Sequence, residues 1–595
     1  MNKKDSKENQ ELLKKYVEIY ASSNSIKNDE FEIVFGTKYG GISRINFENV
    51  ISRLKSLGFT SNNGSGNYHL NIKNQFINER SGKTTMSSVR TTISGLTGIQ
   101  KYCNTDEIDK DFKNTTFMQK TIKIYDEERL FPINYDEFGF RVNYKTEKTL
   151  KTEFGIVKDM LNKWNNQKKI FRLLKRFTYT HPDLPIKVDL SVVRSSKKQR
   201  YNLIPEYRIE NSNVFNNPES YEIEIEIDKS HPRYPIIITP DKIKDTEEYI
   251  IYTIRRSTKI ILSGLQESNF PISFLERDSV INNYMNILYR NPPDRRIRSR
   301  DFVGPSSVSL ELKNILPLTD DNTVPNIRTP YTVTEKADGL RKLLFISSNG
   351  KIYLIDTNMR VQFTGVKTDS KQYYNTILDG EHVVKGKKDE FLNYYLAFDI
   401  YYINKKDIRD FGFYMEGVGD SKEGRLVELN NLLREINLLP IVGNNLPLKI
   451  RAKEFHYSDE RTNAIFSNCK TILEKINSSH FDYETDGLIF TPADKGVASY
   501  KTGEILEPVK TTWHASMKWK PSHLNTIDFL VTTLKNESKD DVVRNIFESG
   551  DKVSSSNNIK QYKILQLRVG FDEKRDGYLN PSEDVIQGNI KRKEV

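Results

Sequence analysis

The chain has 595 residues, too many for one hydrophobic core, and this length predicts three or four domains. Its formal net charge of +11 fits a protein that contacts nucleic acid, although 91 basic against 80 acidic residues implies that much of the charge is solvated surface. With only Cys103 and Cys469 and no apolar run of membrane-spanning length, the sequence excludes a disulfide framework, a cysteine zinc site and a membrane partner, so we expect a soluble intracellular protein.

The first predicted element is an amphipathic helix that ends near Ala21. Its apolar face contains Leu13, Tyr16, Val17 and Tyr20. We expect this helix to dock on a neighbouring element rather than to take part in catalysis.

Two segments far apart in the chain alternate between acidic and apolar residues. Residues 30–35 read EFEIVF, and residues 221–227 read YEIEIEI. In a strand this period places the carboxylates on one face and the apolar side chains on the other. The carboxylates would either lie in water or face into a barrel, where they would need a metal ion and compensating cations because unpaired buried carboxylates are costly.

The sequence between these segments supplies cations in strand-like runs such as FGFRVNYK and KIFRLLKRFTYT. The basic residues concerned are Arg90, Lys120, Arg141, Lys145, Arg172, Lys175, Arg176 and Arg194, and Asp189 lies in a further alternating run. Acidic strands at both ends of a domain, with basic strands between them, are similar to the triphosphate tunnel metalloenzymes. The specific resemblance is to the RNA triphosphatase domain of viral and fungal capping enzymes.

This resemblance covers most of residues 1–235 and implies an antiparallel β-tunnel. The implied reaction is metal-assisted hydrolysis of the γ-phosphate from a 5′-triphosphate RNA end. The resemblance implies Glu30, Glu32, Glu222, Glu224 and Glu226 as ligands of Mg²⁺ or Mn²⁺, with Glu30, Glu32 and Glu224 catalytic, and Arg141, Lys175 and Arg194 as triphosphate contacts.

Residues 236–300 change character and are predicted to form a helical connector. After Pro235 and Pro240 come helical runs such as DTEEYIIYTIRRSTKIILSGL. The connector ends in a basic cluster, DRRIRSR, at residues 294–300. This cluster would either contact RNA or form a solvated linker.

Residues 332–345 read TVTEKADGLRKLLF and form a compact motif on a strand-to-turn segment. The motif sets the amine of Lys336 beside the carboxylate of Asp338 and the guanidinium of Arg341. Such a set suits attack on a nucleotide α-phosphate, provided that neighbouring cations or a metal favour the neutral amine. Taken alone, Lys336 is equally well explained as a surface lysine before an Asp-Gly turn.

Four more segments follow in a fixed order, and each ends or interrupts a β-rich apolar run. They are Leu378–Glu381, Phe398–Asp399, Glu484–Gly487, and Lys518–Pro521 leading into Thr526–Phe529. Polar residues at strand ends gather around a cleft. Five such segments in one order are improbable by chance at average residue usage.

Together these segments resemble the guanylyltransferase domain of mRNA capping enzymes, above all the large capping proteins of nucleocytoplasmic large DNA viruses. The resemblance covers residues 301–530 and implies GTP as substrate, with Lys336 as the nucleophile that forms a phosphoramidate with GMP. The other implied roles are catalysis for Asp338 and Arg341, ribose contacts for Arg341 and Glu381, base stacking for Phe398, metal binding for Asp486 with Asp399 or Asp528 in support, and α-phosphate contacts for Lys518 and Lys520.

The carboxy-terminal part departs from the family pattern. The family continues into an OB-fold lid, and here KILQLRVGF predicts an opening lid strand, so residues 531–595 are expected to form a partial lid. Arg575-Asp576 follows that strand too closely to be the lid's phosphate-binding motif and is interpreted as a loop. We expect either a fragment of a longer protein or an incomplete lid, and no methyltransferase motif is visible.

The sequence therefore predicts an α+β protein with two successive activities on one RNA end, triphosphatase and guanylyltransferase. The resemblance also implies a methyltransferase domain or subunit and a viral RNA polymerase as partners, and a cytoplasmic location in a viral factory or virion. Two alternatives remain open: an ATP-dependent polynucleotide ligase, and a noncatalytic RNA-binding protein on the same scaffold.

Overall fold

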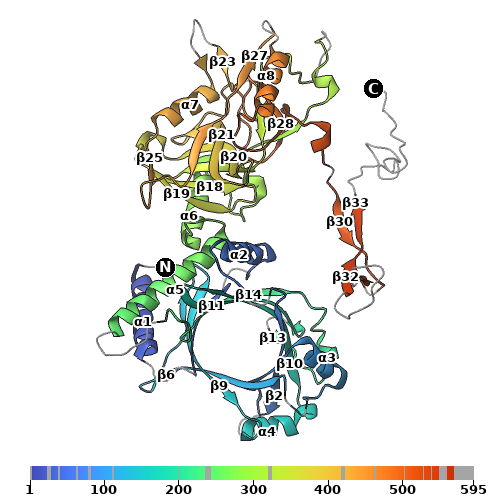
Figure 1. Cartoon of the computed structure of the whole chain (residues 1–595). Helices are drawn as coiled ribbons and strands as arrows, with labels where there is room; N and C mark the ends of the chain where they lie inside the picture. The colour runs from blue at the N-terminus through green and yellow to red at the C-terminus, as the bar shows by residue number, and fades with distance from the viewer. Residues whose placement is uncertain are drawn as a thin grey trace.

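The structure is a computed structural model of the whole chain. It describes residues 3–22, 28–37, 41–61, 64–77, 82–109, 111, 113–199, 202–234, 243–318, 324–416, 422–460, 464–501, 503–526, 528–537, 539, 541–547 and 559–568. A β-barrel formed by the first part of the chain lies below a two-sheet domain, and a narrow ribbon of strands runs along one side (Figure 1).

Eight antiparallel strands close the barrel. In spatial order they are β1 (Asp29–Phe35), β14 (Ser220–Ile227), β11 (Leu184–Ser195), β10 (Lys169–His181), β2 (Asn67–Ile77), β4 (Val89–Ser94), β5 (Thr115–Ile122) and β9 (Phe140–Leu150). Closure comes from β1, which pairs with both β14 and β9. The expected antiparallel tunnel is thus confirmed as a fold.

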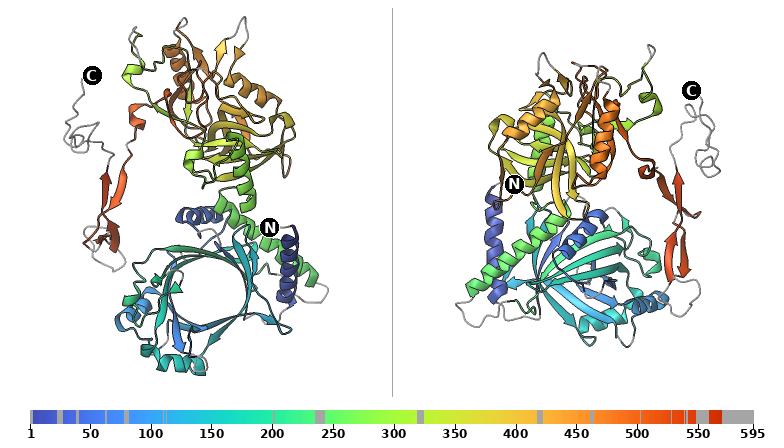
Figure 2. Two further views of the ribbon diagram at one scale, coloured as in Figure 1. Left: turned by 180° about the vertical axis from the view of Figure 1, so that it is seen from behind. Right: turned by 45° about the horizontal axis from the view of Figure 1, so that its top comes forward.

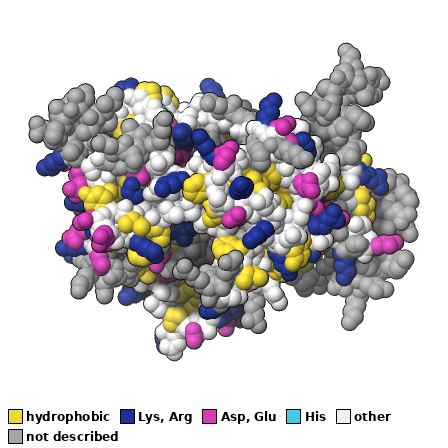
Figure 3. Space-filling view, turned by 90° about the horizontal axis from the view of Figure 1, so that it is seen from below, with side chains coloured by type: hydrophobic (Ala, Val, Ile, Leu, Met, Phe, Trp, Pro, Cys, Tyr) yellow, Lys and Arg dark blue, Asp and Glu magenta, His cyan; other side chains and the backbone are white. Residues whose placement is uncertain are grey.

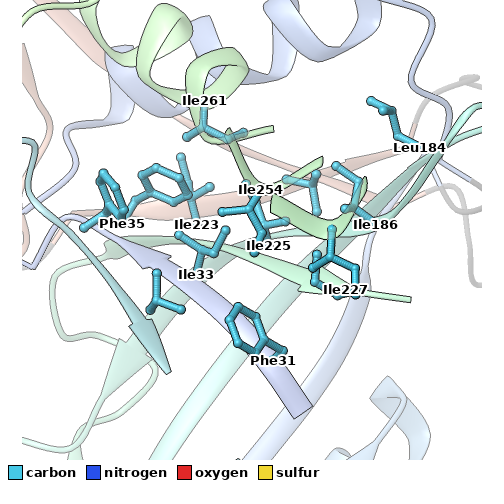
Figure 4. Close-up of a cluster of buried hydrophobic side chains, with 14 of the residues drawn as sticks. Phe31, Ile33, Phe35, Leu184, Ile186, Ile223, Ile225, Ile227, Ile254 and Ile261 are labelled. Carbon is cyan, nitrogen blue, oxygen red and sulfur yellow. The ribbon is translucent and has the colours of Figure 1, made fainter. Parts of the chain in front are cut away.

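The apolar faces of β1 and β14 point out of the barrel and form a hydrophobic core with helices. Ile33 and Ile225 lie opposite each other in the strand register and are fully buried. They pack with Ile254 and Ile261 of α5 (Ile243–Gln266), which crosses the outside of the barrel (Figure 4). Because alternate residues face opposite sides of a strand, this packing turns the glutamates of both strands into the tunnel.

Three more helices cover this side of the barrel or follow from it. α1 (Lys3–Ser22) buries Tyr16 and Val17 against the same core, α2 (Arg44–Ser56) packs on α5, and α6 (Phe274–Leu288) leads to the second domain. Both views in Figure 2 show α5 and α6 between the barrel and the upper domain. The remaining elements of the barrel part are β3 (Thr84–Met86), α3 (Leu96–Thr105), β6 (Ile124–Tyr125), β7 (Glu128–Arg129), β8 (Ile133–Tyr135), α4 (Gly155–Asn162), β12 (Lys198–Gln199) and β13 (Asn202–Leu203).

The second domain contains two sheets that face each other. One has the order β15 (Ser306–Ser309), β29 (Thr512–Trp519), β28 (Thr485–Pro492), β16 (Tyr331–Ala337) and β27 (His456–Ser458). The other has the order β22 (Lys406–Asp407), β21 (Phe391–Ile403), β20 (Thr376–Lys385), β17 (Leu340–Ile346), β18 (Lys351–Asp356), β19 (Val361–Thr368) and β25 (Leu438–Pro440), with β26 (Lys449–Ala452) beside β21. The chain crosses from the first sheet to the second at residues 338–339, so the lysine motif lies between the sheets.

Helices α7 (Arg425–Glu435) and α8 (Ile465–Asn477) pack on the outer sides of these sheets, and β23 (Met415–Glu416) pairs with β24 (Lys422–Glu423). After η7 (Ser522–Leu524) the chain forms two short ribbons, β30 (Leu530–Thr533) with β33 (Leu565–Arg568) and β31 (Val543–Phe547) with β32 (Ile559–Lys563). The predicted lid strand overlaps β33, whereas Arg575-Asp576 lies outside the described residues.

The surface carries both signs of charge. Seen from below, basic, acidic and apolar side chains are interspersed over the described part of the barrel wall (Figure 3). No helix in the described segments combines the length and the apolar character that a membrane crossing requires.

Two candidate active sites

The tunnel wall brings the predicted acidic residues onto adjacent strands. Glu32 of β1 pairs in register with Glu226 of β14, and Glu224 lies opposite Val34. Glu30 is two residues from Glu32 on the same face. The two segments of alternating sequence, about 190 residues apart, therefore form one continuous acidic wall.

Cations on adjacent and next-but-one strands of the same wall contact these carboxylates. Lys120 of β5 lies 2.7 Å from Glu30, and Lys145 of β9 contacts Glu32. Arg176 of β10 lies 3.8 Å from Glu224. Arg172 pairs with Glu222, and Arg176 also contacts Asp189 at 2.9 Å. Each pair can exist at this depth because the opposite charge offsets the loss of water.

The balance between burial and these cations differs along the wall. Burial raises the pKa of Glu30 to about 7, and Lys120 offsets only part of that effect. Burial also raises the pKa values of Glu224 and Glu226. At Glu32 burial acts in the same direction, but Lys145 and Lys120 outweigh it and the pKa of Glu32 is lowered. Part of the wall is thus short of positive charge.

Of the three predicted triphosphate contacts, one lies on the inner face and two do not. Arg141 shares its face of β9 with Asn143 and Lys145, both of which contact Glu32. Lys175 and Arg194 lie on the outer face, one residue out of step with the inward Arg176. The amine of Lys175 lies 5.5 Å from the ring of Tyr68, and Arg194 pairs with Glu219 at 2.9 Å.

One inward cation, Lys73 of β2, was missed by the sequence reasoning. Its pKa is lowered by burial and then by the cations around it, first Arg90 and Arg172. Residues 70–75 read LNIKNQ, and buried Leu70 and Ile72 alternate with the polar side chains. That alternation was the available signal.

The tunnel offers the donor chemistry of a hard divalent ion. Carboxylate oxygens are the ligands that Mg²⁺ and Mn²⁺ prefer, and the raised pKa values of Glu30, Glu224 and Glu226 indicate carboxylates that an added cation would stabilise. In the part of the chain that the structure describes, no three acidic, histidine or cysteine side chains are grouped closely enough to hold an ion. Glu30, Glu32, Glu222 and Glu224 are instead paired with lysine or arginine.

The second candidate site centres on Lys336 at the end of β16. Its amine lies 2.7 Å from Asp486 Oδ1, and the amine of Lys520 lies 2.6 Å from Asp486 Oδ2. Burial acts to raise the pKa of Asp486, but the hydrogen bonds from both lysines outweigh it, so that pKa is lowered. The carboxylate therefore stays charged between two amines.

Gly487 is what lets Asp486 reach this position. Its φ is +146°, and a Cβ added there would lie 1.9 Å from the carbonyl oxygen of Trp519. Only glycine allows β28 and β29 to approach so closely. The close approach sets Asp486 beside Lys520, which follows β29 directly.

A cavity of about 290 Å³ opens beside Lys336 between the two sheets. Its lining includes six of the predicted residues, which come from five different strands: Lys336, Arg341, Glu381, Phe398, Asp399 and Lys518. The cavity is of a size to take a nucleotide base and sugar. The aromatic ring of Phe398 and the charged side chains are thus presented to one space.

Arg341 is held rigidly at the cavity wall by groups that were not assigned a role. Its Nε and Nη2 donate to the carboxylate of Asp379, which is fully buried and also accepts from the hydroxyl of Tyr401. Its Nη1 donates to the carbonyl oxygen of Pro305 at 2.6 Å. Asp379 raises the pKa of Arg341 despite the opposing effect of burial. A guanidinium has five N–H donors, so two remain for a ligand.

Glu381 and Lys453 complete the charged lining. Burial raises the pKa of Glu381 to about 7, although Lys453 and Arg341 act to lower it. Lys453 is itself buried and contacts the carboxylate of Glu335, which also accepts from the hydroxyl of Tyr483. The sequence reasoning missed Lys453, because its segment, RAKEFHY, carries no recognised motif.

Three predicted residues lie apart from the cavity chemistry. Asp338 and Asp528 are exposed, and neither lines the cavity. Asp399 touches the cavity, but Arg425 donates to both of its oxygens. Lys520 reaches the site through Asp486 rather than through the cavity lining.

Parts of this chain are similar to known capping enzymes. Residues 279–521 match the family model described as mRNA capping enzyme, catalytic domain. A probable mRNA-capping enzyme of Acanthamoeba polyphaga mimivirus is 25% identical over 54% of this chain and 28% of its own length. The mRNA-capping enzyme of Mus musculus is 26% identical over 38% of this chain and 34% of its own length. The chain thus spans about a third of the length of these relatives.

Among solved structures, the triphosphatase of the mimivirus capping enzyme is similar at 16% identity, with a TM-score of 0.25, over 43% of this chain and 99% of that chain. The tunnel assignment rests on the strand pairing given above. The family match covers the lysine motif and the four segments that follow it, as far as Pro521. The continuation at Thr526–Phe529 lies beyond the matched residues. The resemblance seen in the sequence is therefore confirmed as a similarity: residues 279–521 match the model of the mRNA capping enzyme catalytic domain, and part of the chain is similar to a probable viral capping enzyme.

Proposed function

We propose that this chain is a bifunctional mRNA 5′-capping enzyme that acts on triphosphate-ended RNA and on GTP. The observation that carries the proposal is the set Lys336, Asp486 and Lys520 beside a nucleotide-sized cavity, within a domain that matches the family. We assign residues 1–235 to the triphosphatase, 236–300 to a connector, 301–530 to the guanylyltransferase and 531–595 to a partial lid.

In the guanylyltransferase step Lys336 is the nucleophile. The ammonium first loses a proton, and its nitrogen then forms a bond to the α-phosphorus of GTP as pyrophosphate leaves, with loss of a second proton from nitrogen. A terminal oxygen of diphosphate-ended RNA next attacks the same phosphorus, the P–N bond breaks, and the lysine takes back a proton. Lys518 and Lys520 offset the charge that builds on the α-phosphate, which is most effective where water is excluded.

The other cavity residues bind and orient the nucleotide. Phe398 stacks on the base, a contact worth about 1–3 kcal/mol for any base. Arg341 and Glu381 contact the ribose, with Arg341 fixed by Asp379. Lys453 lines the same cavity, and its ammonium can donate a hydrogen bond to a carbonyl oxygen of a purine base.

In the triphosphatase step the basic residues of the tunnel bind the triphosphate and the acidic residues bind the metal ion. Lys120, Lys145, Arg172 and Arg176 bind the triphosphate oxygens, and a water attacks the γ-phosphorus so that inorganic phosphate leaves a diphosphate end. Glu30, Glu32, Glu224 and Glu226 would hold Mg²⁺ or Mn²⁺, with Glu222 beside them, and Asp486 would do so in the other site. The ion supplies charge neutralisation of the phosphate oxygens.

The proposed capping function also implies partners and a location for the chain. A capped end is a substrate for methylation, so a methyltransferase domain or subunit is a proposed partner, and the RNA polymerase that makes the transcript is another. A relative from a virus supports a viral factory or virion as the proposed location.

Covalent labelling tests the guanylyltransferase proposal. With Mg²⁺ or Mn²⁺, the full chain should acquire label from [α-³²P]GTP and not from ATP, and Lys336→Met should abolish the label. Lys385→Met, an exposed lysine of β20, is the matched control and should label normally. Labelling from ATP alone would favour the ligase alternative, and no labelling would favour the binding protein.

Phosphate release from triphosphate-ended RNA tests the tunnel separately. Glu224→Gln keeps the shape of the side chain but removes its charge and should reduce release by at least about a hundredfold. Glu219→Gln changes a glutamate that pairs with Arg194 on the outer face and should leave release unchanged. Equal activity of the two variants would rule out the acidic wall as the site.

A further inference from the structure

The basic cluster of residues 294–300, which the sequence left open between an RNA contact and a solvated linker, is held in a fixed conformation. Arg295 donates through Nη1 and Nη2 to the carboxylate of Asp301, at 2.9 and 2.6 Å, and Asp301 is fully buried. The backbone N–H of Arg298 donates to the same carboxylate at 2.8 Å. A mobile linker would not have a buried anchor of this kind.

Two further contacts tie this segment to the core of the upper domain. The hydroxyl of Tyr284, on α6, donates to the carbonyl oxygen of Asp301 at 2.8 Å and accepts from the N–H of Val303 at 3.1 Å. Ile297 packs against the same hydrophobic core. The anchored residues of the segment are therefore Arg295, Ile297 and Asp301.

The remaining cations of the segment face solvent. Arg296 and Arg298 flank the inward Ile297, and Arg300 follows in a short 3₁₀ turn; all three side chains are exposed. Within the described part of the chain, none of the three has a carboxylate partner within 4 Å. The N–H of Lys510 donates to the carbonyl oxygen of Arg300, which adds a fourth exposed cation. We name Arg296, Arg298, Arg300 and Lys510 the basic ridge.

The basic ridge continues directly into the wall of the nucleotide cavity. Phe302 lies 5.6 Å from the guanidinium of Arg341, and Pro305 accepts a hydrogen bond from Arg341 and lines the cavity. Five residues span at most about 18 Å, so Arg300 lies within a few nucleotides' length of the cavity. On the other side of the same path, Ser306 donates to the carbonyl oxygen of Thr511, next to Lys510.

We propose that the basic ridge binds the phosphate backbone of the acceptor RNA and guides its 5′ end to Lys336. This inference rests on the proposed guanylyltransferase activity and adds the surface that takes the second substrate. Arg296 and Arg298 are two residues apart, and Arg298 has extended backbone, so their Cα atoms can lie up to about 7 Å apart, which is on the scale of successive phosphates in an extended single strand. Arginine suits this role because its planar fork binds phosphate oxygens in pairs.

Binding of single-stranded RNA to the full chain is the first test. The triple variant R296A/R298A/R300A should bind a diphosphate-ended RNA about tenfold more weakly in fluorescence anisotropy. The slope of log affinity against log salt should fall by about 2, because three phosphate contacts release fewer counterions. The control K367A/K371A/R434A removes three exposed charges from the same domain, away from the cavity, and should change neither quantity.

The two half-reactions separate this inference from the proposed function. Labelling from GTP needs no RNA and should be the same in the triple variant and in the wild type. In the triple variant, transfer of the label to diphosphate-ended RNA should be about tenfold slower than in the wild type at low RNA concentration. The rate of transfer should return to the wild-type value as the RNA concentration is raised. Transfer to a diphosphate-ended dinucleotide, which has a single internucleotide phosphate and so cannot fill a ridge of several cations, should be much less affected.

Two outcomes would overturn the inference. Wild-type RNA affinity and transfer in the triple variant would exclude the ridge as an RNA surface, as would occur if it served an acidic protein instead. A loss equal to that of the K367A/K371A/R434A control would show only a general charge effect. Failure of the wild type to take label from GTP would refute the proposed function instead, and RNA binding would still report on the ridge.

Discussion

Replacing Asp379 with Asn should destabilise the upper domain strongly, because Asp379 is a fully buried carboxylate with three donors on it. It accepts from Nε and Nη2 of Arg341 and from the hydroxyl of Tyr401. Breaking a buried charge pair costs about 3–5 kcal/mol, since the remaining charge is left uncompensated. Asn keeps one acceptor oxygen, so we expect a value near the lower end, about 3 kcal/mol.

That loss should appear as a fall in melting temperature of about 6–12 °C, at about 2–4 °C per kcal/mol for a domain of this size. Two of the three tryptophans, Trp513 and Trp519, lie on β29, so tryptophan fluorescence reports mainly on the upper domain. Asp389→Asn is the matched control: its side chain is 87% exposed, and its pair with Lys385 should contribute nothing measurable.

A double-mutant cycle shows whether the effect passes through Arg341. The combined change of Asp379→Asn and Arg341→Gln should cost less than the sum of the two single changes, because either one alone already breaks the pair. Additive losses, or a melting temperature for Asp379→Asn within a degree or two of the wild type, would refute the view that Asp379 fixes Arg341.

Four further outcomes are expected. Burial raises the pKa of Glu381 from its ordinary value of 4.5 to about 7, so the stability that this residue contributes is full below pH 4.5 and is lost as pH rises through 7. Between pH 5 and 8, the free energy of unfolding of Glu381→Gln, measured by urea titration, should therefore rise relative to that of the wild type by up to about 3 kcal/mol. Free energies of unfolding that change in parallel with pH in the two proteins would contradict this. Lys175→Ala should leave phosphate release from triphosphate-ended RNA within about twofold, whereas Arg176→Ala should reduce it by tenfold or more; the reverse ranking would mean that the strand faces are misassigned. Gly487→Ala should cost about 3 kcal/mol or more and abolish GMP labelling, against a small effect for Gly155→Ala, where an added Cβ meets nothing within 4 Å and φ lies outside the left-handed region. In calorimetry Mn²⁺ should bind the full chain at least about tenfold more tightly with inorganic tripolyphosphate present than without it, and equal affinities would rule out coupling.

The acidic strands show what alternation can and cannot predict. The period of two in YEIEIEI predicted which side chains share a face, and Ile223, Ile225 and Ile227 do pack together. It could not predict which face is inside, because that depends on where the apolar face finds a partner. α5, more than fifteen residues beyond β14, covers the isoleucines from outside, and this turns the glutamates inward.

The basic residues of the tunnel were harder to predict for the same reason. Lys175 and Arg176 are neighbours in a strand rich in lysine and arginine, and composition alone does not distinguish them. Only the register with β11, which pairs Arg176 with Ser191 and Lys175 with Val192, fixes their faces. A shift of one residue in that register would exchange them.

The residues around the cavity beside Lys336 were easier to predict, because their motifs are short and local. Lys336, Arg341, Glu381, Phe398 and Lys518 all reach one cavity, as their positions at strand ends suggested. The residues that were missed act through long-range contacts. Arg425 holds Asp399 from a helix, and such pairings leave no pattern in the local sequence.

If the tunnel is the proposed triphosphatase, its charge pairs determine how triphosphate and metal ion would bind together. Glu30 is held by Lys120 and Glu32 by Lys145, so a triphosphate that takes either lysine leaves a buried carboxylate without a counter-charge. The carboxylates that are released this way are the ones that prefer a divalent cation, and Glu30 is already short of positive charge, as its raised pKa indicates. A bound triphosphate would draw the lysines away from the carboxylates, and a bound metal ion would replace the positive charge that the carboxylates lose. Triphosphate and metal ion should therefore bind with positive coupling, and by linkage each must raise the affinity of the other by the same factor.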